Sequence, residues 1–296
     1  MIQIVCCTDD NYAFNFAVLA QSILDHHPAD AVAFHLMHSE LSEYSSRGIQ
    51  EFARASGIEL HTYPIDESIF ENLPRISYFG IATYFRFLIP ELLPATLDRV
   101  LYLDMDIIVD GRLEPLWATP LEGCSAAVVE DGVPAHLGAL APATYFNAGV
   151  MLINMAYWRT EDVKGRALAA MMEHAAIIRY GDQDALNIVL ANSKRMVDRK
   201  WNAHMMMDKA LMRRAARGQI GSADRPVVIH FNQKIKPWMF NCKHAYTRQY
   251  REILSRTPFK DQPIKNAGLG SALFYLTPKP LRGLLWSKAM NARLGR

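Results

Sequence analysis

Short apolar runs alternate with helix-like segments along the first two hundred residues, and this alternation limits the possible folds more than any other feature. Strands separated by helices form a mostly parallel sheet that is covered on both faces. The predicted strands are residues 2–7, 31–37, 58–65, 100–106, 124–129, 148–155 and 226–231, and the predicted helices are 12–26, 41–56, 76–88, 164–178 and 184–190. The sequence therefore predicts an α/β protein of Rossmann-like type.

The alternation ends near residue 241, where prolines, basic residues and scattered aromatics take over. After Asp261 the chain has no acidic residue, while lysines and arginines continue to its end. Basic residues beside Trp286 and Leu284 are typical of a segment that lies on an anionic membrane, and a solvated tail is the alternative. We predict a main α/β domain over 1–245 and a basic, aromatic appendage over 246–296 that contacts a membrane surface or a ligand of the main domain, mainly through 265–296.

Charge and targeting features narrow the function classes. Lysine and arginine (32) nearly balance aspartate and glutamate (30), so the net charge of +2 argues against a nucleic-acid-coating role. The N-terminus lacks the features of a secretory signal, and no apolar run reaches the roughly 18 residues of a membrane span. Cys6 and Cys7 would point to opposite faces of a strand, and the four cysteines show no paired spacing. We expect a cytoplasmic protein with reduced thiols.

Two carboxylates follow a buried strand in the stretch "VLYLDMDIIVDG". In an extended chain Asp104 and Asp106 would project from one side, roughly 7 Å apart. Burying both charges unpaired costs several kcal/mol each, by order of magnitude, unless a cation lies between them. His230 ends another apolar run, and two carboxylates with one imidazole suit Mn²⁺ or Mg²⁺. The alternatives are that the aspartates cap a turn and that His230 is a core histidine.

Two basic side chains are candidates for binding phosphate or a buried carboxylate. Lys236, in "KIKPW", follows His230 closely enough to reach the same cleft as a point charge for phosphate. Its alternative is an ordinary surface lysine. Arg86 lies among apolar and aromatic neighbours in "ATYFRFLIP", where an arginine either extends to solvent or holds a buried anion. The usual glycine-rich motifs that bind dinucleotides and nucleoside triphosphates are absent, so a nucleotide must be held differently.

Seven sequence blocks, in this order, resemble the retaining glycosyltransferases of family 8, which include glycogenin and bacterial lipooligosaccharide galactosyltransferases. They span most of residues 1–240 and read "CTDDNYAFN", "FHLMHSELSE", "ISYFGIATYFRFLIPELLP", "RVLYLDMDIIVDGRLEPLW", "YFNAGVMLINMAYWR", "GDQDALNIVL" and "HFNQKIKPW". The resemblance implies a GT-A fold, a UDP-hexose donor, Mn²⁺ (or Mg²⁺), and transfer with retention of anomeric configuration.

Residue roles follow from the same resemblance. The implied metal ligands are Asp104, Asp106 and His230. The implied nucleotide-sugar contacts are Thr8, Asp9, Asn11, Tyr12, Arg86, Asp104, Met105, Asp131, Asn147, Asp182, Gln183, Gln233 and Lys236. Within this set, the implied residues of the reacting centre are Gln183, Asp182, Asn147 and Arg86.

The resemblance leaves alternatives open at three of these positions. The family's closing motif usually has a glycine where this chain has Gln233, which either tilts the loop or supplies an amide hydrogen bond. At the acidic sugar-binding position we favour Asp131 over Glu130. Asp182 would cap a helix if it does not contact substrate.

We therefore predict a retaining hexosyltransferase that transfers galactose or glucose from a UDP-sugar to a saccharide or glycolipid acceptor, such as lipopolysaccharide core. Retention would proceed by same-face attack, with Gln183 stabilising an oxocarbenium-like state. One alternative is a phosphatase of haloacid-dehalogenase type, with Asp104 in "DMDIIV" as nucleophile, although three predicted strands precede that motif. Another is a sugar-nucleotide-binding protein without activity.

Overall fold

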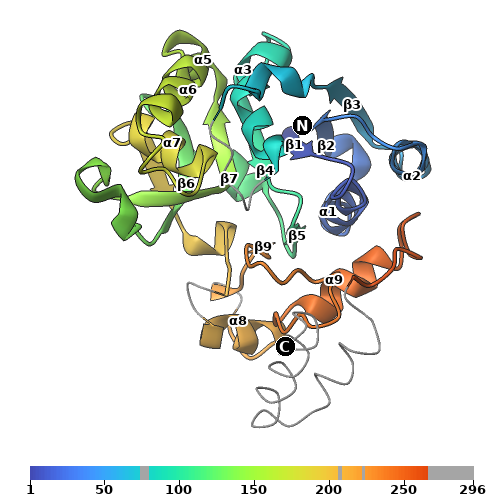
Figure 1. The fold of residues 1–296 in the computed structure, drawn as a ribbon. Helices are drawn as coiled ribbons and strands as arrows, with labels where there is room; N and C mark the ends of the chain where they lie inside the picture. The colour runs from blue at the N-terminus through green and yellow to red at the C-terminus, as the bar shows by residue number, and fades with distance from the viewer. Residues whose placement is uncertain (74–79, 206–208, 222–223, 266–296) are drawn as a thin grey trace, which may run out of the picture.

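The computed structural model describes residues 1–73, 80–205, 209–221 and 224–265 (Figure 1). The strands are β1 (Ile2–Thr8), β2 (Val32–His38), β3 (Glu59–Pro64), β4 (Arg99–Leu103), β5 (Ile107–Val109), β6 (Ala126–Asp131), β7 (Tyr145–Asn154), β8 (Lys194–Val197) and β9 (Val228–His230). The α-helices are α1 (Asn15–Leu24), α2 (Glu43–Ser56), α3 (Ile89–Leu92), α4 (Glu114–Trp117), α5 (Met155–Thr160), α6 (Val163–Glu173), α7 (Asp182–Val189), α8 (Lys209–Ala216) and α9 (Thr247–Leu254). The 3₁₀ helices are η1 (Ala29–Ala31), η2 (Glu67–Phe70), η3 (Ile81–Leu88), η4 (Ala135–Leu140) and η5 (Arg199–Trp201).

A seven-stranded sheet, ordered β3-β2-β1-β4-β7-β6-β8, forms the centre of the described structure. The pairs β3-β2, β2-β1, β1-β4 and β6-β8 are parallel, whereas β7 is antiparallel to both β4 and β6. The predicted mostly parallel α/β sheet is confirmed, with one reversed strand near its middle. A separate two-stranded sheet pairs β5 with β9.

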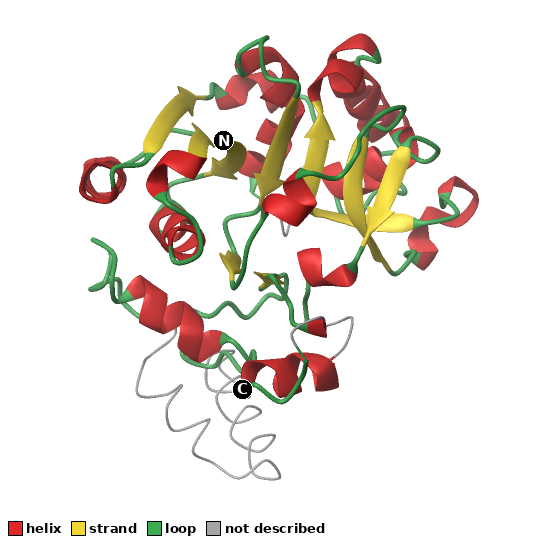
Figure 2. Cartoon of the chain, turned by 180° about the vertical axis from the view of Figure 1, so that it is seen from behind, coloured by secondary structure: helices red, strands yellow, loops and turns green. Residues whose placement is uncertain are grey.

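The sheet divides the core into two layers because side chains alternate along each strand. Ile4 and Cys6 pack in one hydrophobic cluster, with α1 and α2, while Val5 and Cys7 pack in the other, with η3, α6 and α7. The prediction that Cys6 and Cys7 point to opposite faces is therefore confirmed. Figures 1 and 2 show helices on both faces of the sheet, with β5, β9, α8 and α9 together below it.

Three of the differences between the structure and the sequence expectations bear on the site. The predicted strand over 100–106 ends at Leu103, and Asp104 to Asp106 form a turn, so the extended geometry expected for the two aspartates is wrong. Residues 81–88 form a 3₁₀ helix, in which side chains three apart eclipse, and Tyr84 stacks on Phe87. The late apolar run becomes β9 of the small sheet and does not join the central one. Residues 76–79 of the predicted helix over 76–88 lie outside the described residues.

The segment after residue 245 begins as part of the main core. Tyr250 of α9 is fully buried and donates a hydrogen bond to Asn15 of α1. Tyr250 and Phe259 both belong to the cluster that contains α1. The part of the predicted appendage from 266 to 296 lies outside the described residues. Among the described helices, none combines the length and the apolar character that crossing a bilayer requires.

Candidate active site

The predicted site residues meet at one edge of the central sheet. Thr8 ends β1, Asp104 follows β4 and Asp131 ends β6. Because β7 is antiparallel, its beginning lies at this same edge, which brings Asn147 to the ends of the other strands. The small sheet adds His230, whose residue position pairs with Ile107. Ligand sites of α/β sheets lie at such strand ends.

Asp104, Asp106 and His230 form a cluster in which one potential ligand atom from each lies within 4.8 Å of the others. His230 Nε2 is 3.7 Å from Asp104 Oδ2 and 3.1 Å from Asp106 Oδ1. This donor set of two carboxylates and an imidazole fits Mn²⁺ or Mg²⁺. Gly149 makes the arrangement possible, since a Cβ there would lie 2.3 Å from His230 Cε1 and 2.7 Å from Asp104 Oδ2.

Asp104 is oriented by two hydrogen bonds on the oxygen that faces away from His230. Its Oδ1 accepts from Arg86 at 2.9 Å and from the Tyr102 hydroxyl at 2.7 Å, which leaves Oδ2 beside His230. The Arg86 guanidinium also donates to Ala148 O and lies 3.1 Å from Asp182. Of the two interpretations of Arg86, the structure shows the one in which this arginine holds buried anions, and the two anions are Asp104 and Asp182.

Asp106 pairs with Lys236 in addition to His230. Lys236 Nζ lies 2.5 Å from Asp106 Oδ2 and donates to Phe231 O at 2.8 Å. Burial opposes ionisation of Asp106, but Lys236 and His230 hold its pKa well below the usual range. Burial likewise opposes the charge on Lys236, yet Asp106 keeps the pKa of that ammonium above its usual value. Lys236 is thus a half-buried ion-pair partner and not an ordinary surface lysine.

The residues predicted for the reacting centre form a connected hydrogen-bond network. Asn147 Nδ2 donates to Gln183 Oε1 at 3.0 Å, and Gln183 Nε2 donates to the Tyr145 hydroxyl at 3.0 Å. That hydroxyl donates to Asp184 at 2.6 Å. Burial raises the pKa of Asp182 to about 6. The Arg86 guanidinium acts to lower this pKa, and the Asp104 carboxylate acts to raise it further. Asp182 opens α7 at its first turn, where the helix dipole favours a carboxylate.

The predicted uridine residues follow β1. Asp9 Oδ1 accepts from Tyr12 N at 3.1 Å, the Tyr12 ring packs edge-on against Trp238, and Asn11 is exposed. Burial raises the pKa of Tyr12, although the nearby Lys236 ammonium acts to lower it.

Three other predicted contacts differ in their surroundings. The Met105 side chain is buried in the hydrophobic core. Asp131 accepts from Gly132 N and lies 3.9 Å from the buried His204, whereas Glu130 points to solvent. Gln233 is half-buried.

Sequence reasoning missed Gly149, Tyr102, Tyr145 and Asn202. The Asn202 side chain is fully buried and lies between His230 and Asn147. The first three lie inside predicted strands or next to one, where their residue types are unremarkable. Their position beside predicted ligands in space was the missing signal.

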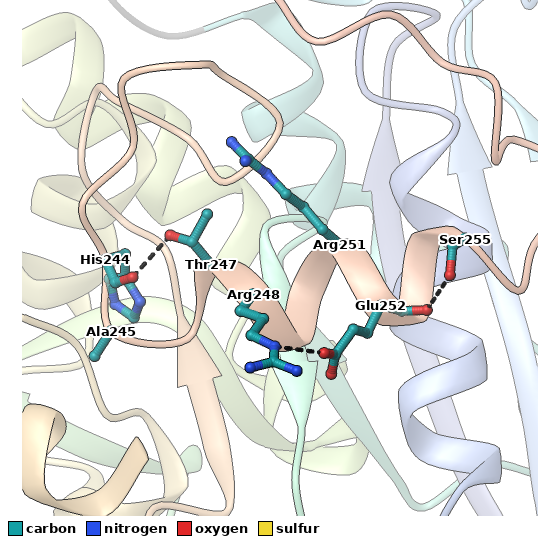
Figure 3. Close-up of a pocket in the computed structure, with 7 residues that line it drawn as sticks. All are labelled: His244, Ala245, Thr247, Arg248, Arg251, Glu252 and Ser255. Atoms are coloured by element: carbon teal, nitrogen blue, oxygen red, sulfur yellow. Dashed lines mark hydrogen bonds and ion pairs between the residues drawn. The ribbon is translucent and has the colours of Figure 1, made fainter. Parts of the chain in front are cut away.

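A pocket elsewhere on the surface contains none of the predicted site residues. Figure 3 shows it along α9, with Arg248 paired to Glu252 and Thr247 donating to the carbonyl of His244. Its remaining lining residues are Ala245, Arg251 and Ser255. His244, which lines this pocket, also packs against the Phe231 ring.

A mostly parallel sheet with an Asp-x-Asp turn and a histidine at its ligand edge defines the class of GT-A glycosyltransferases. The profile described as Glycosyl transferase family 8 matches residues 3–242, and the chain belongs to that family. The predicted family and enzyme class are therefore confirmed.

Two curated relatives and one solved structure are similar to the chain over most of their lengths. Lipopolysaccharide 1,3-galactosyltransferase of Salmonella typhimurium is 29% identical, covering 90% of this chain and 82% of the relative. Lipopolysaccharide 1,2-glucosyltransferase of Escherichia coli strain K12 is 26% identical, covering 88% and 79%. The structure of galactosyltransferase LgtC with donor and acceptor sugar analogs superimposes with a TM-score of 0.76 at 25% identity, covering 95% of this chain and 99% of that one.

Proposed function

We propose that this glycosyltransferase transfers a hexose from a UDP-sugar to a saccharide acceptor, with Mn²⁺ or Mg²⁺ as cofactor and with retention of configuration. The observation that carries the proposal is the cluster of Asp104, Asp106 and His230 with the Lys236 ammonium beside it. Three ligand atoms and one adjacent cation suit a divalent ion that shares a diphosphate with the protein.

Different residues of the site would bind the cation and the phosphate. Asp104 Oδ2, Asp106 Oδ1 and His230 Nε2 are the atoms that would hold the ion. A bound divalent ion would supply charge neutralisation for the UDP leaving group. Lys236 has a compact ammonium at the same point and would bind a phosphate oxygen as a second positive charge. Asp9, Asn11 and Tyr12 would hold uridine, with Thr8, the backbone at Met105 and Gln233 at its border.

The hydrogen-bond network around Gln183 supports same-face substitution. Asp182 is the better nucleophile by chemistry, but its carboxylate lies 3.1 Å from the Arg86 guanidinium, which lowers its reactivity. Gln183 Oε1 is fixed by donors from Asn147 and from the backbone of Ala148. We infer that this oriented amide dipole faces the developing oxocarbenium ion while the acceptor attacks from the face of the departing phosphate. Asp131 would contact the sugar.

We further propose an acceptor of the lipopolysaccharide or lipooligosaccharide core type and a donor hexose that is galactose or glucose. The relatives named above act on lipopolysaccharide and differ in their sugar, which supports the acceptor class and leaves both hexoses in the proposal. An acceptor of that kind is consistent with a cytoplasmic enzyme at the inner face of the membrane, organised as a catalytic domain over 1–245 and a membrane-contacting segment within 246–296.

The test is Mn²⁺-dependent release of UDP from a panel of UDP-sugars, with and without a lipopolysaccharide-core saccharide. We expect turnover with UDP-galactose or UDP-glucose, and its loss in Asp106→Asn. The matched control is Asp224→Asn, which changes an exposed aspartate outside the cluster and should keep wild-type rates. Binding of UDP-sugars without turnover would favour the sugar-nucleotide-binding alternative. Hydrolysis of a simple phosphomonoester with Mg²⁺ would favour the phosphatase, which no feature of the site now supports.

A further inference from the structure

Asn147 has a side-chain orientation that the backbone determines. The amide nitrogen of Gly149 donates to Asn147 Oδ1 at 3.1 Å. A backbone N–H can only donate, so the atom it meets must be the oxygen of the Asn147 amide and not its nitrogen. Asn147 Nδ2 is therefore the end that faces Gln183, where it donates to Oε1.

The orientation of the Asn147 amide determines that of Asn202, and Asn202 in turn contacts His230, a candidate metal ligand. Asn147 Oδ1 accepts from Asn202 Nδ2 at 2.9 Å, which leaves Asn202 Oδ1 facing His230 Nδ1, also at 2.9 Å. An amide oxygen can only accept, so His230 Nδ1 must carry a hydrogen whatever the charge of the ring. The nitrogen available to a cation is then Nε2, the one that lies beside Asp104 and Asp106.

The same direction continues beyond Asn147. The backbone amide of Ala148 donates to Gln183 Oε1 at 3.1 Å, which fixes the orientation of that amide as well. Gln183 then donates to Tyr145, and Tyr145 to Asp184. Every hydrogen bond from His230 to Asp184 thus runs one way, and hydrogen bonds in such a chain polarise one another in a poorly hydrated interior.

We propose that Asn202 is a positioning residue that links the cation site to the reacting centre. It fixes which nitrogen of His230 is available to the cation, and it gives the Asn147 oxygen a second donor beside the Gly149 amide. Its side chain is fully buried, and both ends of its amide are used for these two contacts. This inference rests on the proposed function of the cluster as a cation site in hexose transfer.

Two substitutions separate the two contacts of Asn202. In Asn202→Asp the carboxylate still accepts a hydrogen bond from His230 but cannot donate one to Asn147. Its second oxygen and Asn147 Oδ1 are then two acceptors that face each other with no hydrogen between them. We expect Mn²⁺ affinity to stay at the wild-type value or increase, because a carboxylate partner makes the imidazole a stronger ligand. We expect kcat to fall by about 10- to 100-fold, since the reacting groups lose their alignment.

Asn202→Leu removes both contacts in a side chain of similar size. His230 Nδ1 then has no acceptor, and we expect Mn²⁺ affinity to fall by about 10- to 100-fold together with kcat. The matched control is Asn154→Asp, at the opposite end of β7, where the amide donates to two backbone carbonyls far from the cluster. That variant also loses amide donors, but it should keep both the Mn²⁺ affinity and kcat of the wild type.

The experiment measures Mn²⁺ binding by electron paramagnetic resonance in saturating UDP, followed by kcat with the preferred UDP-sugar. Wild-type or higher Mn²⁺ affinity in the Asp variant and lower affinity in the Leu variant, with kcat reduced in both, would support the proposal. A general loss of structure would instead weaken both properties in both variants. Wild-type kcat in Asn202→Asp, or equal loss of Mn²⁺ affinity in the two variants, would overturn the proposal while leaving the proposed function intact. A wild-type protein without Mn²⁺ binding or turnover would refute the proposed function itself. If the Leu variant does not fold, unchanged affinity with reduced kcat in the Asp variant still decides the question.

Discussion

Replacing Gly149 with alanine would place a methyl group inside the candidate cation site. The new Cβ would lie 2.3 Å from His230 Cε1, 2.9 Å from His230 Nδ1 and 2.7 Å from Asp104 Oδ2. Carbon atoms in ordinary contact are about 3.5 Å apart, so the imidazole and β7 must separate by about 1 Å. Neither side can yield easily, since His230 is held by Asn202 and the Gly149 carbonyl accepts from Asp104 N in the sheet.

This displacement should affect ligand binding far more than folding. Overpacking of one methyl group costs about 1–3 kcal/mol of unfolding free energy, which urea denaturation would measure. A misplacement of about 1 Å in a reacting group can cost on the order of 100-fold in rate. We therefore expect Gly149→Ala to remain folded, to bind Mn²⁺ in the presence of UDP much more weakly, and to lose about 100-fold in kcat/KM.

The control is Gly221→Ala, because a Cβ at Gly221 meets nothing within 4 Å and its backbone needs no glycine. That variant should match the wild type in Mn²⁺ affinity, rate and unfolding free energy. If Gly149→Ala kept the wild-type Mn²⁺ affinity and kcat/KM, the close approach of His230 and Asp104 would be irrelevant to binding, and our assignment of the cluster would be wrong.

Three further expectations follow from the charges of the site. Because the pKa of Asp182 is raised to about 6, the native state binds this proton more tightly than the unfolded chain does. The protonated Asp182 side chain therefore contributes fully to stability below pH 3.8, and this contribution is lost as the pH rises through about 6. Asp182→Asn should therefore gain stability relative to wild type between pH 4 and 7 in urea titrations, and a pH-independent difference would contradict the raised pKa. In Arg86→Lys a single ammonium must replace the guanidinium that contacts two carboxylates and two backbone carbonyls. We expect this variant to lose on the order of 3 kcal/mol of unfolding free energy. An unchanged urea midpoint would argue against the importance of these buried contacts. Mn²⁺ with UDP, at 100 times the dissociation constant, should stabilise the protein by about 2.7 kcal/mol in thermal unfolding. EDTA should reverse this stabilisation, and the His230→Ala variant should not show it. Equal stabilisation of that variant would show that His230 is not a ligand.

Most of the strands and the cluster of Asp104, Asp106 and His230 could be predicted from sequence because each gives a local signal. A buried parallel strand is a short apolar run, and Asp104 and His230 stand directly after or at the end of one. A polar group at the end of such a run points to the ligand edge of the sheet without knowledge of any other contact.

The supporting residues could not be predicted because their partners are distant in sequence. Asn202 contacts residues 28 and 55 positions away, and a single asparagine between Trp201 and Ala203 forms no pattern. The reversed direction of β7 brings Asn147 to the site from the beginning of a strand, so only the family resemblance, and not the position in the sheet, predicts it. Periodicity also cannot assign β9 to the small sheet, since a three-residue apolar run reads the same in either.

The contact between Lys236 and Asp106 gives the site an internal counter-ion. A cation held by Asp106 Oδ1 would lie close to the Lys236 ammonium on Oδ2, and an arriving anion would relieve the repulsion between these two positive charges. We therefore expect Mn²⁺ alone to bind weakly and nucleotide alone to bind weakly, each raising the affinity for the other by the same factor, as reciprocity requires. Such an enzyme would take up cofactor and donor together and release them together after each transfer.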